Sequence, residues 1–430
     1  MSIAGDRFVV VGGRPVGGTL VPAGNKNEAL PALAAALLAR GPCVLENVPD
    51  IRDVRTLLDI MAELGVAAAS RADGALELDA SDLAERPPSL DLGAAIRGSF
   101  LLAPGLLHRT GRAVLPRPGG DRIGRRRIDT HLHALRQLGA EIEASERHYD
   151  LRLAGRFRGG DIFLDEASVM ATENAVMAAA VADGRTRIAN AASEPHVQGL
   201  CRLLQAMGAR IDGVGTNVLH IEGVAELRPA RHRIGPDHIE IGSFVAIAAM
   251  TGGELRIAPV VADDLRMIRM VFARLGVRAE LEGSELFVPG KQELVVQDDQ
   301  GGAIPKVDDA PWPGFPSDLT SIALVLATQA RGTVLIHEKM FENRLFFVDR
   351  LISMGARVVL CDPHRAIVTG PAELQAETLS SPDIRAGMAL VAAALCARGR
   401  SVIMNAHQVD RGYERIDERL RGLGAEIVRT

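Results

Sequence analysis

The feature that most constrains the fold is a short motif that recurs six times along the chain. Each copy is a helix-like run that ends in Leu or Met, followed by Gly, then Ala or Val, then a strand-like run. Successive glycines lie between 68 and 79 residues apart, at Gly65, Gly139, Gly208, Gly276, Gly355 and Gly424. Glycine takes the left-handed conformation that ends a helix at little cost. A repeat of this length predicts one supersecondary unit per copy.

A second marker recurs in phase with the first. It is an Ala- and Leu-rich helix, then Gly, then an apolar strand-like run, with copies around Gly41, Gly184, Gly332 and Gly399 and weaker ones around Gly111 and Gly252. These helices are apolar on nearly every side, so we expect them to be buried. One helix–Gly–strand joint would be unremarkable, but six in phase indicate duplication. The sequence therefore predicts an α/β protein of six units, divided into two domains of three.

The bulk properties narrow the class of protein. A chain of 430 residues is too long for one ordinary core. The net charge of -5 and the 3% aromatic content argue against a nucleic-acid partner. No apolar run is long enough for membrane insertion, and Met1-Ser2-Ile3 begins no signal pattern. Neither the four cysteines nor the eleven histidines have metal-ligand spacing. We expect a cytoplasmic protein without a metal.

The stretch from Pro118 to Asp129 combines three glycines, four arginines and two carboxylates. Glycines let a backbone approach a ligand closely, and arginine forks match the oxygens of carboxylates and phosphates. Asp121, Arg126, Arg127 and Asp129 are therefore candidate site residues. An exposed turn followed by a basic helix start is an equally good interpretation of this stretch alone, because charge runs are usually solvated.

Other charged residues stand at the starts or edges of apolar helices. Lys26 and Asn27 precede one such helix, where an ammonium and a helix N-terminus together make an anion site. Further candidates are Arg97, Asp318, Arg344, Asp383, Arg385 and Arg411. Taken singly, each is explained by a helix cap or a structural ion pair.

The motifs taken together resemble those of the enolpyruvyl transferase superfamily, and within it the UDP-N-acetylglucosamine 1-carboxyvinyltransferase family. The resemblance runs from Gly24-Asn25-Lys26-Asn27-Glu28 to Asp410-Arg411-Gly412-Tyr413-Glu414, essentially the whole chain. It implies the EPSP synthase-like fold, a two-domain inside-out α/β barrel of six βαβ-type repeats that closes over its substrates. The expected domains are a discontinuous one, residues 1–24 with 236–430, and an inserted one, residues 25–235, that carries the catalytic loop.

The resemblance also implies a reaction: transfer of the enolpyruvyl group of phosphoenolpyruvate to UDP-N-acetylglucosamine in peptidoglycan synthesis, with no cofactor. Six cations would bind phosphoenolpyruvate. Lys26, Arg126 and Arg411 would cradle its phosphate, Arg344 and Arg385 would hold its carboxylate, and Arg97 would add positive potential.

Four polar residues would handle the acceptor and the protons. Asp318 would draw the proton from the acceptor hydroxyl, and Asn27 would orient the sugar. Asp121 would protonate the methylene carbon of phosphoenolpyruvate, and Asp383 would assist the tetrahedral intermediate.

The chain departs from the family pattern at several positions. Asp121 stands where most members have a cysteine, so the resemblance implies insensitivity to fosfomycin, which alkylates that cysteine. Arg127 stands where proline is usual, Met170 where glycine is usual, and Glu166 where some members have lysine.

The departures at Arg127, Met170 and Glu166 fall in the segments that would bind the uridine and diphosphate. The expected contacts there are Arg127, Asp129, Ser168 and Val169. The acceptor is therefore either UDP-N-acetylglucosamine or another nucleotide such as uridine monophosphate. A catalytically silent paralogue that binds phosphoenolpyruvate or nucleotide is the third alternative.

Overall fold

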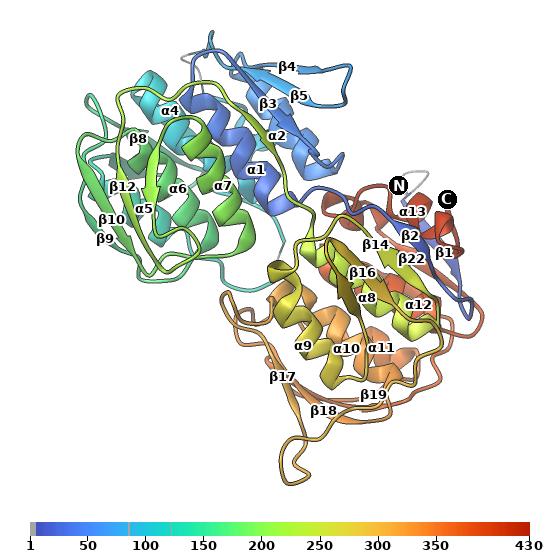
Figure 1. The fold of residues 1–430 in the computed structure, drawn as a ribbon. Coiled ribbons are helices and arrows are strands. Elements are labelled where there is room, and N and C mark those ends of the chain that lie inside the picture. Colours follow the sequence, from blue (N-terminus) through green and yellow to red (C-terminus); the bar gives the residue numbers. More distant parts are fainter. Residues whose placement is uncertain (1–5, 85–86, 122) are drawn as a thin grey trace. The chain divides into compact units, whose positions relative to one another are not determined.

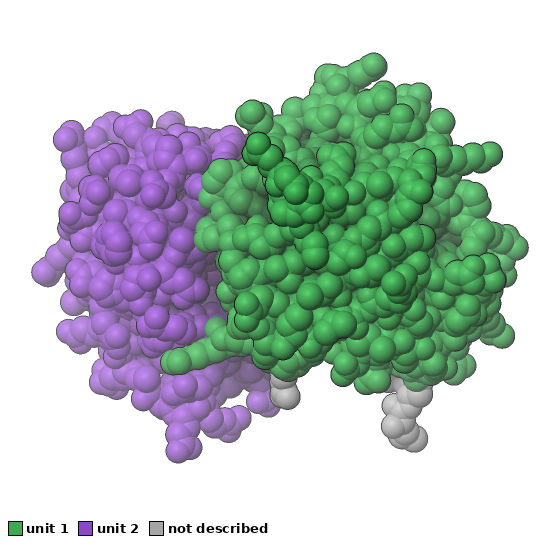
Figure 2. Space-filling view, turned by 90° about the horizontal axis from the view of Figure 1, so that it is seen from below, with its two compact units in different colours: residues 1–23, 121–125, 236–430 green, residues 24–120, 126–235 purple. Residues whose placement is uncertain are grey.

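The computed structural model describes residues 6–84, 87–121 and 123–430. Contacts divide the chain into two compact units, drawn in green and purple in Figure 2. Unit 1 comprises residues 1–23, 121–125 and 236–430, and unit 2 comprises residues 24–120 and 126–235. Residues 121–125 thus group with unit 1, whereas the sequence had placed them in the inserted domain.

Unit 2 is built from three small sheets and the helices between them (Figure 1). In order across each sheet, the strands are β13 (Arg231–Arg233), β3 (Pro42–Glu46), β5 (Leu76–Asp79) and β4 (Ala67–Ser70); β6 (Arg112–Pro116), β8 (His148–Arg152) and β7 (Glu141–Ala144); and β11 (Arg210–Asp212), β12 (Val218–Glu222), β10 (Arg185–Ala189) and β9 (Asp161–Phe163). The helices are α1 (Lys26–Ala35), η1 (Ala36–Leu38), α2 (Arg52–Glu63), α3 (Leu90–Ala94), η2 (Arg97–Leu102), α4 (Ala103–Thr110), α5 (Asp129–Gln137), α6 (Val169–Ala180) and α7 (Pro195–Ala206).

Unit 1 repeats this plan. Its sheets are β21 (Thr378–Ser380), β22 (Arg400–Met404), β1 (Arg7–Val11) and β23 (Glu426–Arg429); β15 (Glu280–Glu282), β16 (Glu285–Val288), β14 (Leu255–Ile257) and β2 (Gly18–Leu20); and β17 (Lys306–Asp308), β18 (Gly332–His337), β20 (Arg365–Gly370) and β19 (Arg357–Asp362). Its helices are α8 (His238–Thr251), η3 (Asp263–Leu265), α9 (Arg266–Arg274), η4 (Ser317–Leu319), α10 (Thr320–Gln329), α11 (Val348–Ser353), α12 (Ile384–Cys396), η5 (Ala406–Arg411) and α13 (Ile416–Gly422).

The glycines of the first marker end helices, as the repeat predicted. The six glycines of the first marker follow α2, α5, α7, α9, α11 and α13, and all have positive φ, from 88° to 109°. Those of the second marker come after η1, α4, α6, α8, α10 and α12, with φ from 72° to 138°. Each of the six repeats therefore contributes one buried and one partly exposed helix.

The Ala- and Leu-rich helices form the centre of each unit. Nearly every residue of α8, α10 and α12 is buried, and these three helices pack against one another. In unit 2, α1 and α6 are buried along most of their length, and α4 packs against η1 and α6. Helices inside and sheets outside confirm the predicted α/β class. Within the described part of the chain, no helix combines the length and the apolar character needed to cross a membrane.

Candidate active site

Two buried arginines of unit 1 grip one carboxylate. Nη2 of Arg344 lies 2.8 Å from Oδ1 of Asp318, and Nε and Nη2 of Arg385 lie 2.9 and 2.8 Å from Oδ2. The arginine side chains are 2% and 5% exposed. Burial opposes their charge, but the surrounding groups, led by Asp318, together raise the pKa of both guanidiniums. We call Arg344 and Arg385 the arginine clamp; its geometry is that of a carboxylate-binding site.

Local structure places the three members of this group. Arg385 is the second residue of α12, Asp318 lies in η4 just before α10, and Arg344 lies in the loop that follows β18. The Arg385 guanidinium also lies over the buried ring of Tyr413, 5.3 Å from its centroid. The Nε atom of Arg344 has no hydrogen-bond partner among the described residues. An unmet buried donor is costly, so the clamp retains capacity for a further acceptor.

Asp383 begins the helix that carries Arg385. Its Oδ1 atom accepts hydrogen bonds from the backbone N–H groups of Arg385 and Ala386, at 2.9 and 3.0 Å, and so caps α12. The residue is buried, and this burial raises the pKa of its carboxyl despite the positive charge of Arg344. The negative charge of Asp121 raises it further. Asp383 is therefore a candidate for carrying a proton beside the clamp.

Asp121 forms an ion pair with Arg411, the last residue of η5, and both side chains are largely buried. The segment that follows Asp121 is tied to the loop carrying Arg344. The backbone N–H of Arg125 donates to Glu342 Oε2 at 3.2 Å. Gly124 has φ 141°, a backbone conformation that residues with a side chain rarely adopt, so this position favours glycine.

Unit 1 thus gathers six of the predicted site residues in one region: Asp121, Asp318, Arg344, Asp383, Arg385 and Arg411. Their contacts link η4, α12, η5 and the loop after β18. Three carboxyl groups and three guanidiniums suit the binding of a small anion together with proton transfer. Among the described residues, no group of three or more His, Cys, Asp or Glu side chains is arranged to hold a metal ion.

A second group of predicted residues lies in unit 2. Lys26 is the first residue of α1, and its Nζ is 2.7 Å from Oδ2 of Asp53, with both side chains nearly buried. Asn27 follows it, half-buried, in the turn that Asn25 caps. The sequence did not indicate Asp53 as the partner of Lys26, because Asp53 stands on another helix.

Arg97 stands at the start of η2, which packs against α1. Its guanidinium donates to the backbone carbonyls of Arg126 and Arg127, at 3.3 and 2.7 Å. Burial, followed by the charge of Arg126, lowers the pKa of Arg97 to about 10. Arg97 therefore holds the backbone of the arginine-rich stretch as well as adding charge.

The side chain of Arg127 is engaged by carboxylates of its own unit. Its Nε lies 3.0 Å from Asp129 Oδ2, and its Nη2 lies 3.1 Å from Asp165 Oδ2. Asp165 also accepts a hydrogen bond from Oγ1 of Thr130 at 2.7 Å. Arg127 and Asp129, which we had predicted as substrate contacts, thus brace the loop before α5 in the structure.

The remaining predicted contacts stand at the start of α6. Ser168 is its N-cap residue, but the side chain does not cap, and Val169 is the first helical residue. Met170 packs against the core of unit 2, and Glu166 is exposed and interacts electrostatically with Arg97.

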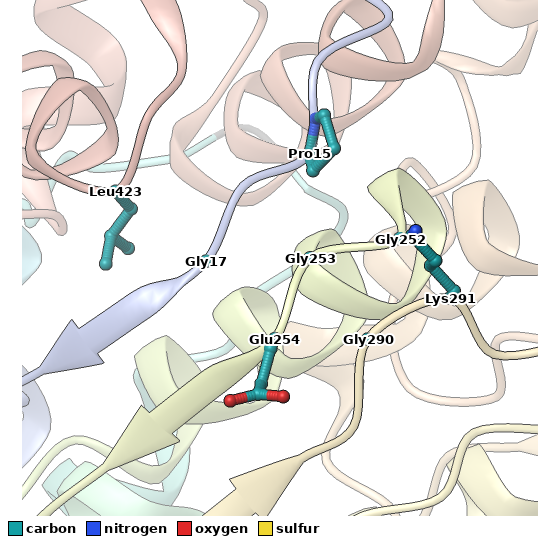
Figure 3. A pocket seen from close by; sticks show the side chains of 8 residues that line it. All are labelled: Pro15, Gly17, Gly252, Gly253, Glu254, Gly290, Lys291 and Leu423. Carbon is teal, nitrogen blue, oxygen red and sulfur yellow. The ribbon is translucent and has the colours of Figure 1, made fainter.

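A shallow hollow of about 510 Å³ lies elsewhere in unit 1, at the end of α8 (Figure 3). It is lined by Pro15, Gly17, Gly252, Gly253, Glu254, Gly290, Lys291 and Leu423. No predicted site residue lines it, and four of its eight lining residues are glycines. The hollow is therefore not part of the candidate site.

Comparison with known proteins gives a consistent result. Residues 10–420 match the family model described as EPSP synthase (3-phosphoshikimate 1-carboxyvinyltransferase). The chain is 54% identical to the UDP-N-acetylglucosamine 1-carboxyvinyltransferase of Treponema denticola, over 98% of each chain. It is also 54% identical to that of Bradyrhizobium diazoefficiens, over 99% of this chain and 98% of the relative. The crystal structure of the enolpyruvyl transferase NikO from Streptomyces tendae is similar with a TM-score of 0.87 and 26% identity, over 98% of both chains.

Proposed function

The chain belongs to the EPSP synthase family, and on that premise we propose that it transfers the enolpyruvyl group of phosphoenolpyruvate to a hydroxyl of UDP-N-acetylglucosamine, releasing phosphate. The product would be a precursor of peptidoglycan. The full-length similarity to relatives with that enzyme name supports this acceptor over another nucleotide. We further propose a cytoplasmic location, where the four free cysteines would remain thiols.

The arginine clamp is the observation that carries the proposal. Phosphoenolpyruvate bears a carboxylate, and Arg344 and Arg385 already hold the carboxylate of Asp318 in a buried setting. A substrate carboxylate that replaces it would separate Asp318 from two cations. Asp318 would then be a stronger proton acceptor, because its charge has lost that stabilisation. Substrate binding would in this way activate the base.

The remaining roles are those that the family resemblance implies, and they are part of the proposal. The oxygen of the acceptor hydroxyl adds to C2 of phosphoenolpyruvate while Asp318 takes the proton of that hydroxyl. Asp121 delivers a proton to C3. In the second step C3 loses a proton, the C2–O bond to phosphate breaks, and the double bond re-forms. Asp383, with its raised pKa, assists the proton transfers.

Cations would neutralise the leaving phosphate. We assign this task to Lys26, Arg126 and Arg411, with Arg97 adding positive potential, because phosphate gains negative charge as it departs. Arg127 and Asp129 are assigned to shaping the acceptor segment rather than to gripping a diphosphate directly, since each is paired within the loop. Asn27, Ser168 and Val169 remain assigned to the acceptor.

The direct test is phosphate release from phosphoenolpyruvate with a panel of acceptors, followed by mass spectrometry of the product. UDP-N-acetylglucosamine should give an enolpyruvyl adduct. Turnover with uridine monophosphate alone would establish the alternative acceptor and overturn the proposed one. Absence of phosphate release with every acceptor would favour a silent, binding paralogue.

A further inference from the structure

Two carboxyl groups that the proposed mechanism does not use are completely buried in unit 1. Asp309 directly follows β17, and Glu338 directly follows β18. These strands are parallel neighbours in which Asp308 is paired with His337, so the two acids come next in register. Parallel strands end at the same edge of a sheet, which places the two carboxyl groups side by side.

The neighbouring Asp309 carboxyl affects the ionisation of Glu338. Burial first, and then the neighbouring Asp309 carboxyl, raises the pKa of Glu338 to about 8. Two carboxyls in contact cannot both be ionised at low cost. Oδ2 of Asp309 is buried and has no hydrogen-bond partner among the described residues, and a protonated Glu338 beside it would supply a donor. Arg344 and His364 also face Glu338, the latter through a 2.7 Å contact with its backbone oxygen.

The pair is connected to both members of the Asp318–Arg344 ion pair. The hydroxyl of Ser317 donates to the two oxygens of Glu338, at 2.8 and 3.0 Å, and Ser317 immediately precedes Asp318. The backbone N–H of Phe341 donates to Glu338 Oε1 at 3.1 Å, at the start of the loop that reaches Arg344. One buried side chain therefore fixes both segments whose ends meet in the Asp318–Arg344 ion pair.

We propose that Asp309 and Glu338 form a proton-sharing positioning pair, which holds Asp318 through Ser317 and Arg344 through Phe341. Neither acid touches the arginine clamp's carboxylate directly, so neither is a catalytic residue. Loss of the shared proton leaves two adjacent buried negative charges, which destabilises this arrangement. The clamp is then set correctly only while the pair is protonated. The inference rests on the proposed function for its kinetic consequence alone.

The chain offers a probe that does not depend on activity. Its one tryptophan, Trp312, is half-buried in the segment between Asp309 and Ser317. Its ring lies against that of His238, with centroids 6.2 Å apart. Tryptophan fluorescence should therefore report the deprotonation of the pair, and any separate transition of His238 should be common to all the variants compared.

The first experiment is a fluorescence titration of the full chain between about pH 5.5 and 9.5, a window that spans the raised pKa. The wild type should show a transition with a midpoint near 8. Glu338→Gln should lose it, because an amide keeps the hydrogen bonds of the protonated acid and does not ionise. The matched control is Glu293→Gln, an exposed glutamate of the same unit, which should keep the transition. Persistence of the transition in Glu338→Gln would overturn the inference.

Kinetics then separate positioning from simple stabilisation. Between pH 7 and 9, kcat/KM for phosphoenolpyruvate should fall in the wild type by about 3-fold or more, but not in Glu338→Gln. Ser317→Ala, which cuts only the link to Asp318, should lower kcat by about 10-fold and leave KM nearly unchanged. A wild-type kcat in Ser317→Ala, or an unchanged alkaline limb in Glu338→Gln, would refute the positioning role. If the wild type itself released no phosphate, the proposed function would fail, and the fluorescence titration would still decide this inference.

Discussion

A carboxylate held between two buried guanidiniums is the residue-level arrangement from which the proposed chemistry starts. Arg344 and Arg385 would each be expensive to bury alone, and Asp318 compensates both. Such a pair binds any carboxylate that presents its two oxygens in one plane. The clamp is thus stable in the structure and chemically suited to exchange one carboxylate for another.

Removing one arm of the clamp should weaken substrate use selectively. We expect Arg385→Ala to lower kcat/KM for phosphoenolpyruvate by about 10- to 100-fold, because a charge-assisted hydrogen bond contributes about 1.5–3 kcal/mol. The KM for UDP-N-acetylglucosamine should change much less. The measurement is phosphate release at varied phosphoenolpyruvate. Arg365→Ala, an exposed arginine paired with Asp362 in the same unit, is the matched control. Equal effects on both KM values would contradict the assignment.

The acid at position 121 should determine the response to an alkylating inhibitor. Wild-type protein should show no time-dependent inactivation by fosfomycin, because a carboxylate is a weak nucleophile compared with a thiolate. Asp121→Cys should acquire it, since Arg411 beside the new thiol favours the thiolate. Residual phosphate release after preincubation, together with the protein mass, measures this. Inactivation of the wild type would show that another residue, such as the exposed Cys361, reacts.

At the scale of elements, the starts of buried helices deliver the functional groups. Lys26 begins α1, Asp318 lies just before α10, and Asp383 caps α12. A helix start offers unpaired N–H groups and a positive dipole end, which favour anions. The duplicated helix is therefore both the core of each unit and the support of its polar residues.

The cap and the chemical role of Asp383 should be separable. Asparagine caps as well as aspartate, so Asp383→Asn should leave the unfolding free energy within about 0.5 kcal/mol of the wild type. Its turnover should fall by about 100-fold, because an amide cannot exchange the proton. Asp383→Ala should in addition lose about 1 kcal/mol of stability. Chemical denaturation and phosphate release measure the two effects. If Asp383→Asn kept full turnover, Asp383 would be a cap only.

At the scale of the whole molecule, the chain contains two separate cores. The buried apolar residues of unit 2 lie between Ala29 and Ile234, and those of unit 1 come from the two ends of the chain. The two ends of unit 2 are also joined. The Glu28 carboxylate, near its start, accepts a hydrogen bond from the backbone N–H of Gly235 at 3.1 Å and lies 2.8 Å from His232 Nε2. A large core of its own is the main requirement for independent folding.

We therefore expect a fragment of residues 24–235 to fold alone and to unfold cooperatively. Circular dichroism during thermal and urea unfolding is the measurement. The control is the fragment 24–225, which lacks β13 and both partners of Glu28 and should be clearly less stable. Non-cooperative unfolding of residues 24–235 would show that unit 2 depends on the rest of the chain.

The sequence alone determined the repeat and the α/β class, and it predicted most residues of the candidate site as candidates. The helix ends at Gly65 and its equivalents could be predicted from the sequence, because a left-handed residue at a helix end is a local requirement of the backbone. Candidate residues such as Lys26 and Arg385 could be predicted because they stand at the starts of apolar helices. The family assignment, which the resemblance predicted, is confirmed by the full-length comparisons.

Pairings between distant segments were decided only by the tertiary structure. No local signature predicts the ion pair of Lys26 with Asp53, the placement of Asp121 beside Arg411, or that of Asp309 beside Glu338. Each depends on which strand ends and helix starts meet in the folded chain, and every carboxylate in the sequence looks alike until burial and neighbours are set. A backbone conformation is a property of a few adjacent residues, whereas the charge state of a buried acid is a property of everything packed around it.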